Sequence, residues 1–219
     1  MNINIFATVA NAFHGGGFFM YPILAVSIAG LAVSMERFMF LMAAASVKKD
    51  EFLNRVNQHI LQGNLERAIA VCSQAHSPLT RIVKAGLVAV ANNKDAEEVQ
   101  TAMDAVALRE VPKIEKRTSL LAMFSNMATL LGLLGTITGL IGAFGAVANV
   151  SPSEKATLLA NSISEAMNCT AFGLIVAIPL LGVFGLLQTK AQALVDDVHE
   201  SAVATLNFIL TNKEKFVRR

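Results

Sequence analysis

Three long stretches without a charged residue constrain this sequence more than any other feature. No Asp, Glu, Lys or Arg occurs in residues 1–35, 118–153 or 166–189, and the last two stretches are 36 and 24 residues long. A helix needs roughly 20 mostly apolar residues to cross a bilayer. Charged residues make up only 16% of the chain, whereas an ordinary soluble domain carries about 25%. The sequence therefore predicts an integral membrane protein and not a soluble enzyme.

The spacing of the apolar runs predicts an all-α fold with three transmembrane helices that extend into a cytoplasmic helical bundle. The second run is too long for a perpendicular crossing, so we expect it to tilt or to protrude from the bilayer. The predicted segments are an N-terminal periplasmic or interfacial helix at 1–17, transmembrane helices at 18–42, 120–147 and 163–187, a cytoplasmic helical domain at 43–119, a periplasmic turn with the start of the third helix at 148–162, and a cytoplasmic C-terminal helix at 188–219.

The distribution of basic residues predicts the orientation. Twelve Lys or Arg occur between positions 37 and 117, five follow the third span, and Lys155 is the only other one. Basic residues favour the cytoplasmic side of a membrane. We therefore expect the N-terminus in the periplasm and the C-terminus in the cytoplasm. At the inner end of the first span, Glu36 and Arg37 are interpreted as an interfacial anchor, with the Arg37 side chain extending towards water.

The segment between the first two spans is predicted to be helical. Apolar residues recur at helical spacing in 52–61, 65–72 and 79–90, separated by Gly-Asn, Ser-Pro and Asn-Asn pairs. A charged amphipathic stretch at 99–116 then runs towards the second span. Pro112 is expected to kink this stretch or to mark a join between two helices.

Several functional classes are disfavoured by composition and motif content. The net charge is only +2 and the chain contains no Trp, which argues against nucleic-acid binding. The four histidines show no metal-ligand spacing, and the two cysteines lie far apart. No phosphate-binding loop of the GxxxxGK[ST] type is present. We therefore predict no catalytic residue, no metal site and no cofactor.

Glycines recur along the second span with a spacing that places them near one face of the helix. Gly132, Gly135, Gly139, Gly142 and Gly145 follow one another at intervals of 3, 4, 3 and 3 residues. Small residues allow membrane helices to approach closely. We predict a helix-packing role for these glycines.

Hydroxyl and amide side chains share the same membrane helices. Ser125, Thr129 and Thr136 repeat at helical spacing on the second span. The third span and its approach add further polar residues, namely Asn161, Ser162, Ser164, Glu165, Asn168 and Thr170. Polar groups inside a membrane usually face a bundle interior or a wet cavity. Two interpretations remain open, a pore lining and hydrogen bonding between helices. No carboxylate lies near the bilayer middle, so ion conduction would need a titrating group from a second chain.

Two motifs resemble those of the TolQ/ExbB/MotA family, the ion-channel proteins of bacterial energy-transducing motors. LLGLLGTITGLIGAF at 130–144 is similar to the family pattern LGLLGTVxGxxxxF, and ISEAMNCTAFGLIVAIPLL at 163–181 is similar to IxEALxxTAxGLxxAIPA. MYPIL at 20–24, followed by MERF at 35–38, resembles the family's first span. The resemblance covers nearly the whole chain and is strongest to the TolQ and ExbB members.

This resemblance implies a specific machine. Such proteins form a ring, generally a pentamer, around the helices of an ExbD/TolR-like single-span partner that carries an essential membrane Asp, and ion flow drives work in the periplasm. By the motif match, Thr136 and Thr170 take the pore-hydroxyl positions, Glu165 the outer polar position, and Pro179 a helix-bending position. The chain departs from the family at Asn168-Cys169, where small apolar residues are commoner.

The resemblance leaves the ion and the load open. The expected function is an ion-conducting ring subunit in the bacterial inner membrane, with proton or sodium as the ion and possible TonB/TolA-like or motility effectors. The load could be nutrient uptake, envelope maintenance or gliding motility. The alternative is a non-conducting membrane scaffold, in which the glycines and hydroxyls only hold helices together.

Overall fold

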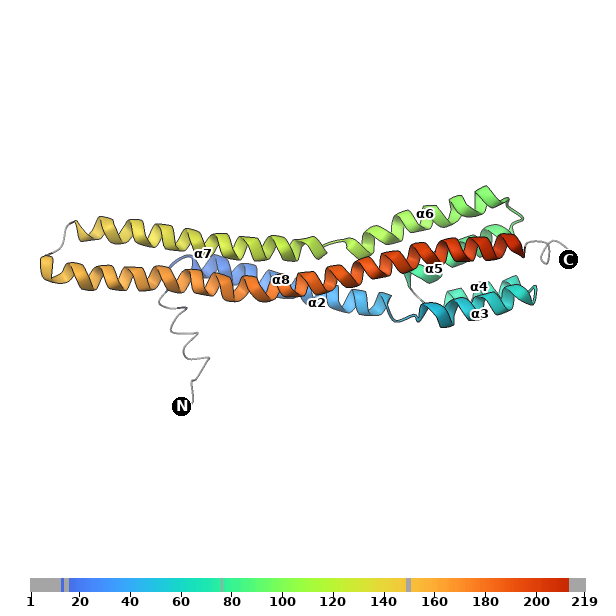
Figure 1. Cartoon of the computed structure of the whole chain (residues 1–219), viewed down its shortest axis with the longest axis horizontal. Coiled ribbons are helices and arrows are strands. Elements are labelled where there is room, and N and C mark those ends of the chain that lie inside the picture. The colour runs from blue at the N-terminus through green and yellow to red at the C-terminus, as the bar shows by residue number, and fades with distance from the viewer. Residues whose placement is uncertain (1–12, 14–15, 76, 149–150, 213–219) are drawn as a thin grey trace, which may run out of the picture. The chain divides into compact units, whose positions relative to one another are not determined.

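The structure is a computed structural model that describes residue 13 and residues 16–75, 77–148 and 151–212. Most of the helix predicted at 1–17 lies outside these residues. The described chain contains helices and no strand (Figure 1). The helices are α2 (Met20–Ala44), α3 (Lys49–Leu61), α4 (Leu65–Gln74), α5 (Pro78–Ala91), α6 (Ala96–Glu115), α7 (Thr118–Val147) and α8 (Pro152–Thr211).

The chain divides into two compact units. Unit 1 comprises residues 1–36 and 117–186, and unit 2 comprises residues 37–116 and 187–219. Helices α2, α7 and α8 each belong to a helical stretch that is long and apolar enough to cross a membrane. This confirms the predicted class, an all-α membrane protein with three transmembrane helices and a helical extension.

Unit 1 is held together by a small apolar core between α2, α7 and α8. Ile23 and Val26 of α2 pack with Ala128 of α7 and with residues of α8 that include Val176 and Leu180. Gly30 gives α2 room against α8, because a Cβ at this position would lie 2.8 Å from both terminal methyl carbons of Leu180. The outer faces of these helices remain strongly apolar and exposed, as expected for surfaces that meet lipid or other membrane helices.

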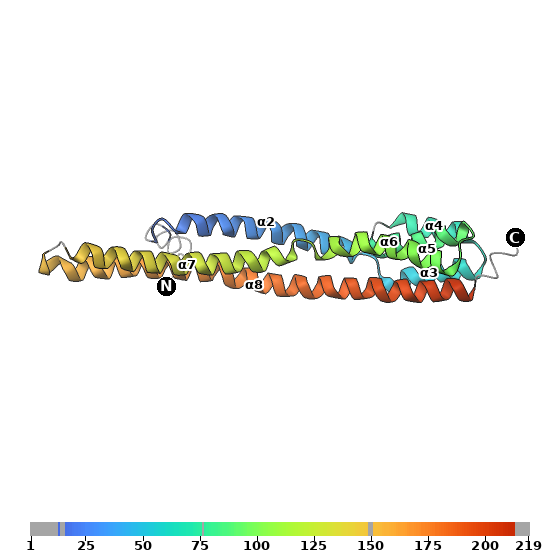
Figure 2. The ribbon, with the colours of Figure 1, turned by 90° about the horizontal axis from the view of Figure 1, so that it is seen from above.

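The α7–α8 hairpin of unit 1 continues past the beginning of α2. Figures 1 and 2 both show α2 starting part of the way along the hairpin. At the level where α2 begins, the Cβ of Phe19 lies 3.4 Å from where a Cβ on Gly135 would be. About three turns of α7 therefore follow this level before the helix ends at Val147.

Unit 2 contains four shorter helices, and three of them, α4, α5 and α6, begin with a side-chain cap. The side chain of Asn64 caps α4, and Ser77 with Thr80 forms a capping box at the start of α5. Asp95 and Glu98 form a second capping box at the start of α6. Each cap satisfies backbone N–H groups that have no partner inside the helix.

The core of unit 2 is formed by apolar residues of α3 to α6, in segments where the sequence predicts amphipathic helices, and by apolar residues of α8. Buried residues are Phe52, Val56 and Ile60 on α3, Ala68 and Cys72 on α4, Ile82, Val83 and Leu87 on α5, Met103 and Ile114 on α6, and Val195, Val198 and Ile209 on α8. Burial raises the pKa of the Cys72 thiol to about 12, so this cysteine is an unreactive core residue.

Two charge clusters link elements within unit 2. The Glu110 carboxylate of α6 is buried and accepts hydrogen bonds from Arg81 of α5 at 3.0 Å and from Lys113 at 2.7 Å. The Lys49 ammonium at the start of α3 contacts Asp197 at 3.0 Å and Glu200 at 2.5 Å, both on α8.

The interpretation of Arg37 as a side chain that extends towards water is wrong. Only 5% of Arg37 is exposed. Its guanidinium donates to the backbone carbonyls of Lys113, at 3.2 Å, and Lys116, at 2.6 Å, and lies 4.7 Å from the ring centre of Phe40. The last carbonyls of a helix have no partner within it and attract cations. Arg37 is therefore a C-terminal cap for α6.

Pro112 does not mark a join between helices. Helix α6 continues through Pro112 to Glu115, and the chain turns only at Lys116 and Arg117. Arg117 has a φ of +65°, in the left-handed region, which separates α6 from α7. The turn lies here because the Arg37 guanidinium satisfies the end of α6, a long-range contact that the sequence pattern does not reveal.

Candidate functional site

Helices α7 and α8 approach each other closely at Gly132 and Gly173. A Cβ on Gly173 would lie 2.7 Å from the Ala128 carbonyl oxygen, and a Cβ on Gly132 would lie 3.2 Å from the Thr170 Cα. Only glycine fits where two helix backbones come this near. The predicted packing face on α7 is therefore matched by Gly173 on α8, which lies within the third charge-free stretch.

Two hydroxyls tie α7 to α8 on either side of this close approach. The Thr170 hydroxyl donates to the Gly132 carbonyl at 2.8 Å, and the buried Ser125 hydroxyl donates to the Ala177 carbonyl at 2.8 Å. Both acceptors are backbone atoms, so sequence patterns alone do not identify them. Within one copy of the chain, Thr170 and Ser125 act as hydrogen-bonding contacts between helices.

Thr136 differs from Thr170 because its hydroxyl stays on its own helix. It donates to the Leu133 carbonyl at 2.7 Å, and the residue is half-buried. Thr136 lies one turn of α7 from Gly132, the acceptor of the Thr170 hydroxyl. Thr138, which is exposed, also bonds its own helix, with the Leu134 carbonyl at 2.9 Å. A threonine that bonds its own helix keeps two oxygen lone pairs available to a neighbour.

Glu165 lies at the level where α2 begins. If Gly17 carried a Cβ, the nearest atom to it would be a carboxylate oxygen of Glu165, so this side chain lies against Gly17. Glu165 is nevertheless exposed. Gly17 has a φ of +72°, which an L side chain rarely adopts. The structure thus places Glu165 beside the turn that precedes the first membrane helix, and about one turn of α8 from Cys169.

The remaining glycines of α7 fall into two groups. Gly135 faces the Cys169 sulfur, and a Cβ on Gly139 would lie 3.0 Å from the Ala166 Cβ, so both glycines pack against α8. For Gly142 and Gly145, no atom of another segment that the structure describes lies within 4 Å of the position that a Cβ would take. The packing role predicted for Gly142 is therefore not fulfilled within a single copy of the chain.

Pro179 lies inside α8, on a surface groove between α8 and α2. The groove has a volume of about 300 Å³ and is lined by Ser27 and Ser34 of α2 and by Pro179 and Ile175 of α8, among others. Proline lacks a backbone N–H, so the carbonyl of Ile175, four residues earlier, loses its usual helical partner.

The described residues contain no group of His, Cys, Asp or Glu that could hold a metal ion. The arrangement in unit 1 is instead a tightly packed helical hairpin with hydroxyls at its contact surface and apolar outer faces. Its class is a multi-pass membrane protein.

The chain belongs to the MotA/TolQ/ExbB proton channel family, whose family model matches residues 74–200. This is a family of channel and transport proteins, not of enzymes.

Two curated relatives agree with this assignment. A putative biopolymer transport protein ExbB homolog from Methanothermobacter thermautotrophicus is 27% identical over 197 residues, which are 90% of this chain and 68% of that protein. A putative biopolymer transport protein ExbB-like 1 from Synechocystis is 33% identical over 184 residues, which are 83% of this chain and 71% of that protein.

Among solved structures, a chain of the Campylobacter jejuni MotAB structure has a similar fold. It matches with a TM-score of 0.61 at 16% identity, over 92% of this chain and 80% of that chain. At this identity the match supports the fold alone.

Proposed function

We propose that this chain is an ion-conducting ring subunit of an energy-transducing motor in the bacterial inner membrane. In this proposal, several copies surround an ExbD/TolR-like single-span partner, and proton or sodium flow between ring and partner drives periplasmic work. The number of copies is five, by the resemblance described above. Membership in a proton channel family supports the proposal, as does a MotAB complex among structures of similar fold.

The observation that carries the proposal is the state of the Thr136 hydroxyl. Its proton is donated to its own helix, and its oxygen retains acceptor capacity on a half-buried surface of α7. Thr170 lies close by on α8 and fixes the helix spacing. A hydroxyl can order water or coordinate a cation but does not titrate near neutral pH. The partner's membrane Asp is therefore proposed as the titrating group.

Glu165 is proposed to line the outer mouth of the pathway. It lies at the level where α2 begins, which in the proposed orientation is the periplasmic end of the first span. An exposed carboxylate at this place would concentrate cations before they enter a pore. The proposed orientation has the N-terminus in the periplasm and the C-terminus in the cytoplasm. A TonB/TolA-like or motility effector would then couple to the partner outside the membrane.

The proposal is tested by reconstituting the chain into vesicles with its co-purified single-span partner. An imposed proton or sodium gradient should produce ion uptake, measured with a pH-sensitive or sodium-sensitive dye. Uptake should disappear when the partner's membrane Asp is replaced by Asn. An equal flux with the Asn variant would rule out the proposed pathway.

The alternative function is a non-conducting scaffold, and one observation favours it. The Ser125 and Thr170 hydroxyls are already satisfied by carbonyls of the facing helix, as expected of groups whose only role is packing. In a scaffold, vesicles that contain the intact complex would show no flux with either ion.

A further inference from the structure

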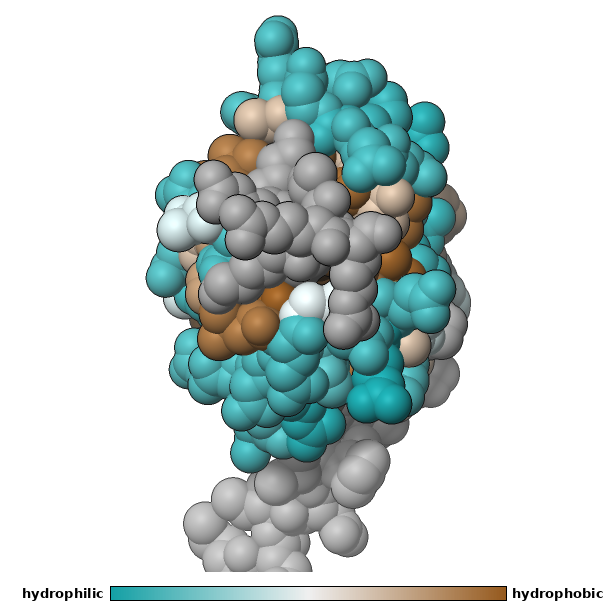
Figure 3. All heavy atoms as spheres, turned by 90° about the vertical axis from the view of Figure 1, so that its right-hand side faces the viewer, coloured by the Kyte–Doolittle hydropathy of each residue, from teal (hydrophilic) through white to brown (hydrophobic). Residues whose placement is uncertain are grey.

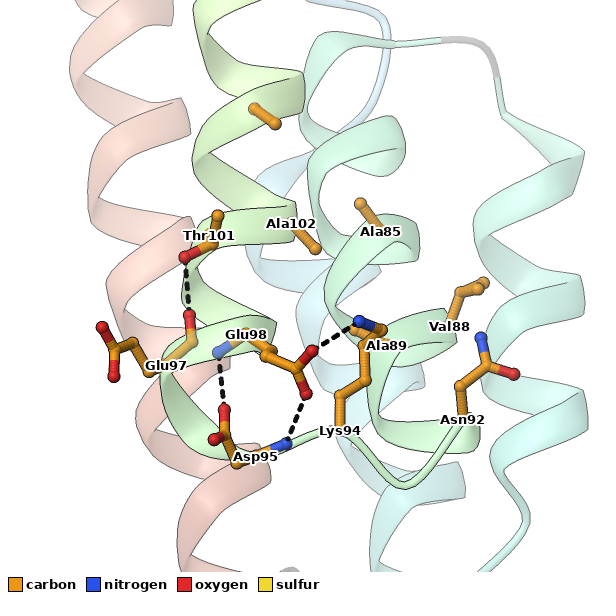
Figure 4. A pocket seen from close by; sticks show the side chains of 11 residues that line it. Ala85, Val88, Ala89, Asn92, Lys94, Asp95, Glu97, Glu98, Thr101 and Ala102 are labelled. Carbon is orange, nitrogen blue, oxygen red and sulfur yellow. Dashed lines mark hydrogen bonds and ion pairs between the residues drawn. The ribbon is translucent and has the colours of Figure 1, made fainter.

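A groove between α5 and α6 in unit 2 is lined at its centre by small apolar side chains. The groove has a volume of about 610 Å³, and Ala85 and Ala89 of α5 face Ala102 and Ala105 of α6 across it. Figure 4 shows Ala85, Ala89 and Ala102 between the two helices. Alanine side chains leave unfilled space between helices, so the groove can accept a bulkier apolar group from another segment.

Carboxylates outnumber basic groups at the end of the groove nearest the α5–α6 loop. Asp95, Glu97 and Glu98 line it together with a single ammonium, that of Lys94. Lys94 contacts Glu98 at 2.7 Å, and the Asp95 side chain accepts from the Glu98 backbone N–H at 2.8 Å (Figure 4). Hydrogen bonds to the Glu98 carboxylate, first from Lys94 and then from the Asp95 backbone N–H, lower its pKa, so this group is ionised at neutral pH. A complementary ligand is a short basic segment with an apolar side chain.

Residues 213–219 of the same chain have this chemistry. Their sequence is KEKFVRR, with four basic residues, one acidic residue and a central Phe216-Val217 pair. Helix α8 ends at Thr211, and Figures 1 and 2 both place this end of α8 at the same end of unit 2 as the α5–α6 loop. Seven extended residues reach about 25 Å at most. Figure 3 looks onto this end and shows apolar surface between hydrophilic side chains.

We propose that residues 213–219 dock into the α5–α6 groove of their own copy, with Phe216 on the alanine surface and the basic residues beside the carboxylates. The segment adds three net positive charges where the groove lining carries two net negative ones. The docked segment connects the end of α8 to the α5–α6 loop. This inference does not depend on the proposed ion pathway.

Disulfide cross-linking in the full chain, within purified membranes, tests the proposal. One variant combines Phe216→Cys with Ala102→Cys, in the groove. The control combines Phe216→Cys with Leu61→Cys, because Leu61 is exposed and ends α3 at the same end of unit 2. The native Cys72 and Cys169 are buried and do not interfere. The groove pair should oxidise at least tenfold faster than the control pair and give a monomer-sized product.

Charge reversal tests the electrostatic part of the proposal. Arg218→Glu with Arg219→Glu, added to the groove pair, should slow its cross-linking at least fivefold, and 0.5 M salt should slow the parent pair in the same way. Similar rates for the groove and control pairs, or no product from either, would overturn the proposal. A dimer-sized product would also overturn it, because it would show that the segment docks on a second copy.

Discussion

At the scale of single residues, the hydroxyls of the membrane helices have different tasks. Ser125 and Thr170 donate across the helix contact, whereas Thr136 and Thr138 donate to their own helix. The sequence pattern groups Ser125 and Thr136 on one polar face of the helix. It could not tell their roles apart, because the role of each hydroxyl depends on which backbone carbonyl accepts its proton. Their consequences for function and stability should therefore differ.

Thr136→Val should reduce ion flux at least tenfold with little change in stability. The substitution keeps the side-chain shape and removes a hydroxyl that donates to its own helix. Thr138→Val is the matched control, since it removes the same kind of bond two residues away, on the exposed side. Flux in reconstituted vesicles is the measurement, at equal protein content. If both variants conduct like the parent, Thr136 is not part of the pathway.

Thr170→Val should destabilise the hairpin by about 1 kcal/mol, because a hydrogen bond between membrane helices is worth roughly that much. The change leaves the Gly132 carbonyl without the hydroxyl that it accepts from in the parent. Unfolding in mild detergent, followed by circular dichroism, measures the difference. Thr138→Val is again the control and should unfold like the parent. An unchanged midpoint for Thr170→Val would contradict an interhelical role.

Glu110 should make the stability of the chain depend on pH in the acid range. Burial raises the pKa of this carboxyl, but hydrogen bonds from Lys113 and Arg81 outweigh burial, so the net pKa is lowered. An unfolded Glu titrates at about 4.3. The stabilisation is thus complete above that pH and is lost as the pH falls through the lower folded pKa.

Glu110→Gln should lower the unfolding midpoint at pH 7 and reduce its fall between pH 5 and pH 3. A Glu115→Gln control, on an exposed residue, should retain the parent's full pH dependence.

At the scale of helices, charge-free runs and capping signals explain what could be predicted. Runs without charge indicated α2, α7 and α8, and Gly63 and Asn93, both with positive φ, end α3 and α5 near the predicted breaks. The end of α6 could not be predicted, because it depends on Arg37, 79 residues before Lys116. Pro112 lies inside α6 without ending it, although the carbonyl four residues earlier loses its usual helical partner.

Glycine-to-alanine substitutions on the two membrane helices should have opposite effects. Gly173→Ala would place a Cβ 2.7 Å from the Ala128 carbonyl oxygen, a backbone atom that cannot move alone. We expect a loss of about 1–3 kcal/mol, typical of overpacking. The Cβ added by Gly142→Ala would meet no atom of another described segment within 4 Å. This substitution should be neutral or slightly stabilising, because alanine favours helix. Thermal unfolding of both variants in the same detergent compares them. Equal loss at the two positions would show that the α7–α8 register is different.

At the scale of the whole molecule, many large apolar side chains of unit 1 are exposed in the part of a single copy that the structure describes. Large apolar residues such as Ile141 and Phe144 are 68% and 64% exposed near the end of α7. They lie beside Gly142 and Gly145, where an added Cβ would meet no atom of another described segment within 4 Å. The sequence could suggest close packing there but not its partner, because glycine spacing is the same for contacts within and between copies. A surface of small and large apolar residues allows other membrane helices to pack closely.

The last prediction separates assembly from folding. Gly142→Leu adds a side chain to a position that is open in one copy, so the chain should still fold and enter the membrane. If another copy of the chain or a partner helix packs against this face, every subunit will carry the added leucine side chain. The resulting overpacking should prevent assembly. Native mass spectrometry of the complex, co-expressed with its single-span partner, should show several copies for the parent and for an Ile141→Leu control. Gly142→Leu should leave mostly monomer. A normal complex with Gly142→Leu would mean that this face of α7 meets lipid, and the ring contacts would then have to lie on other helices.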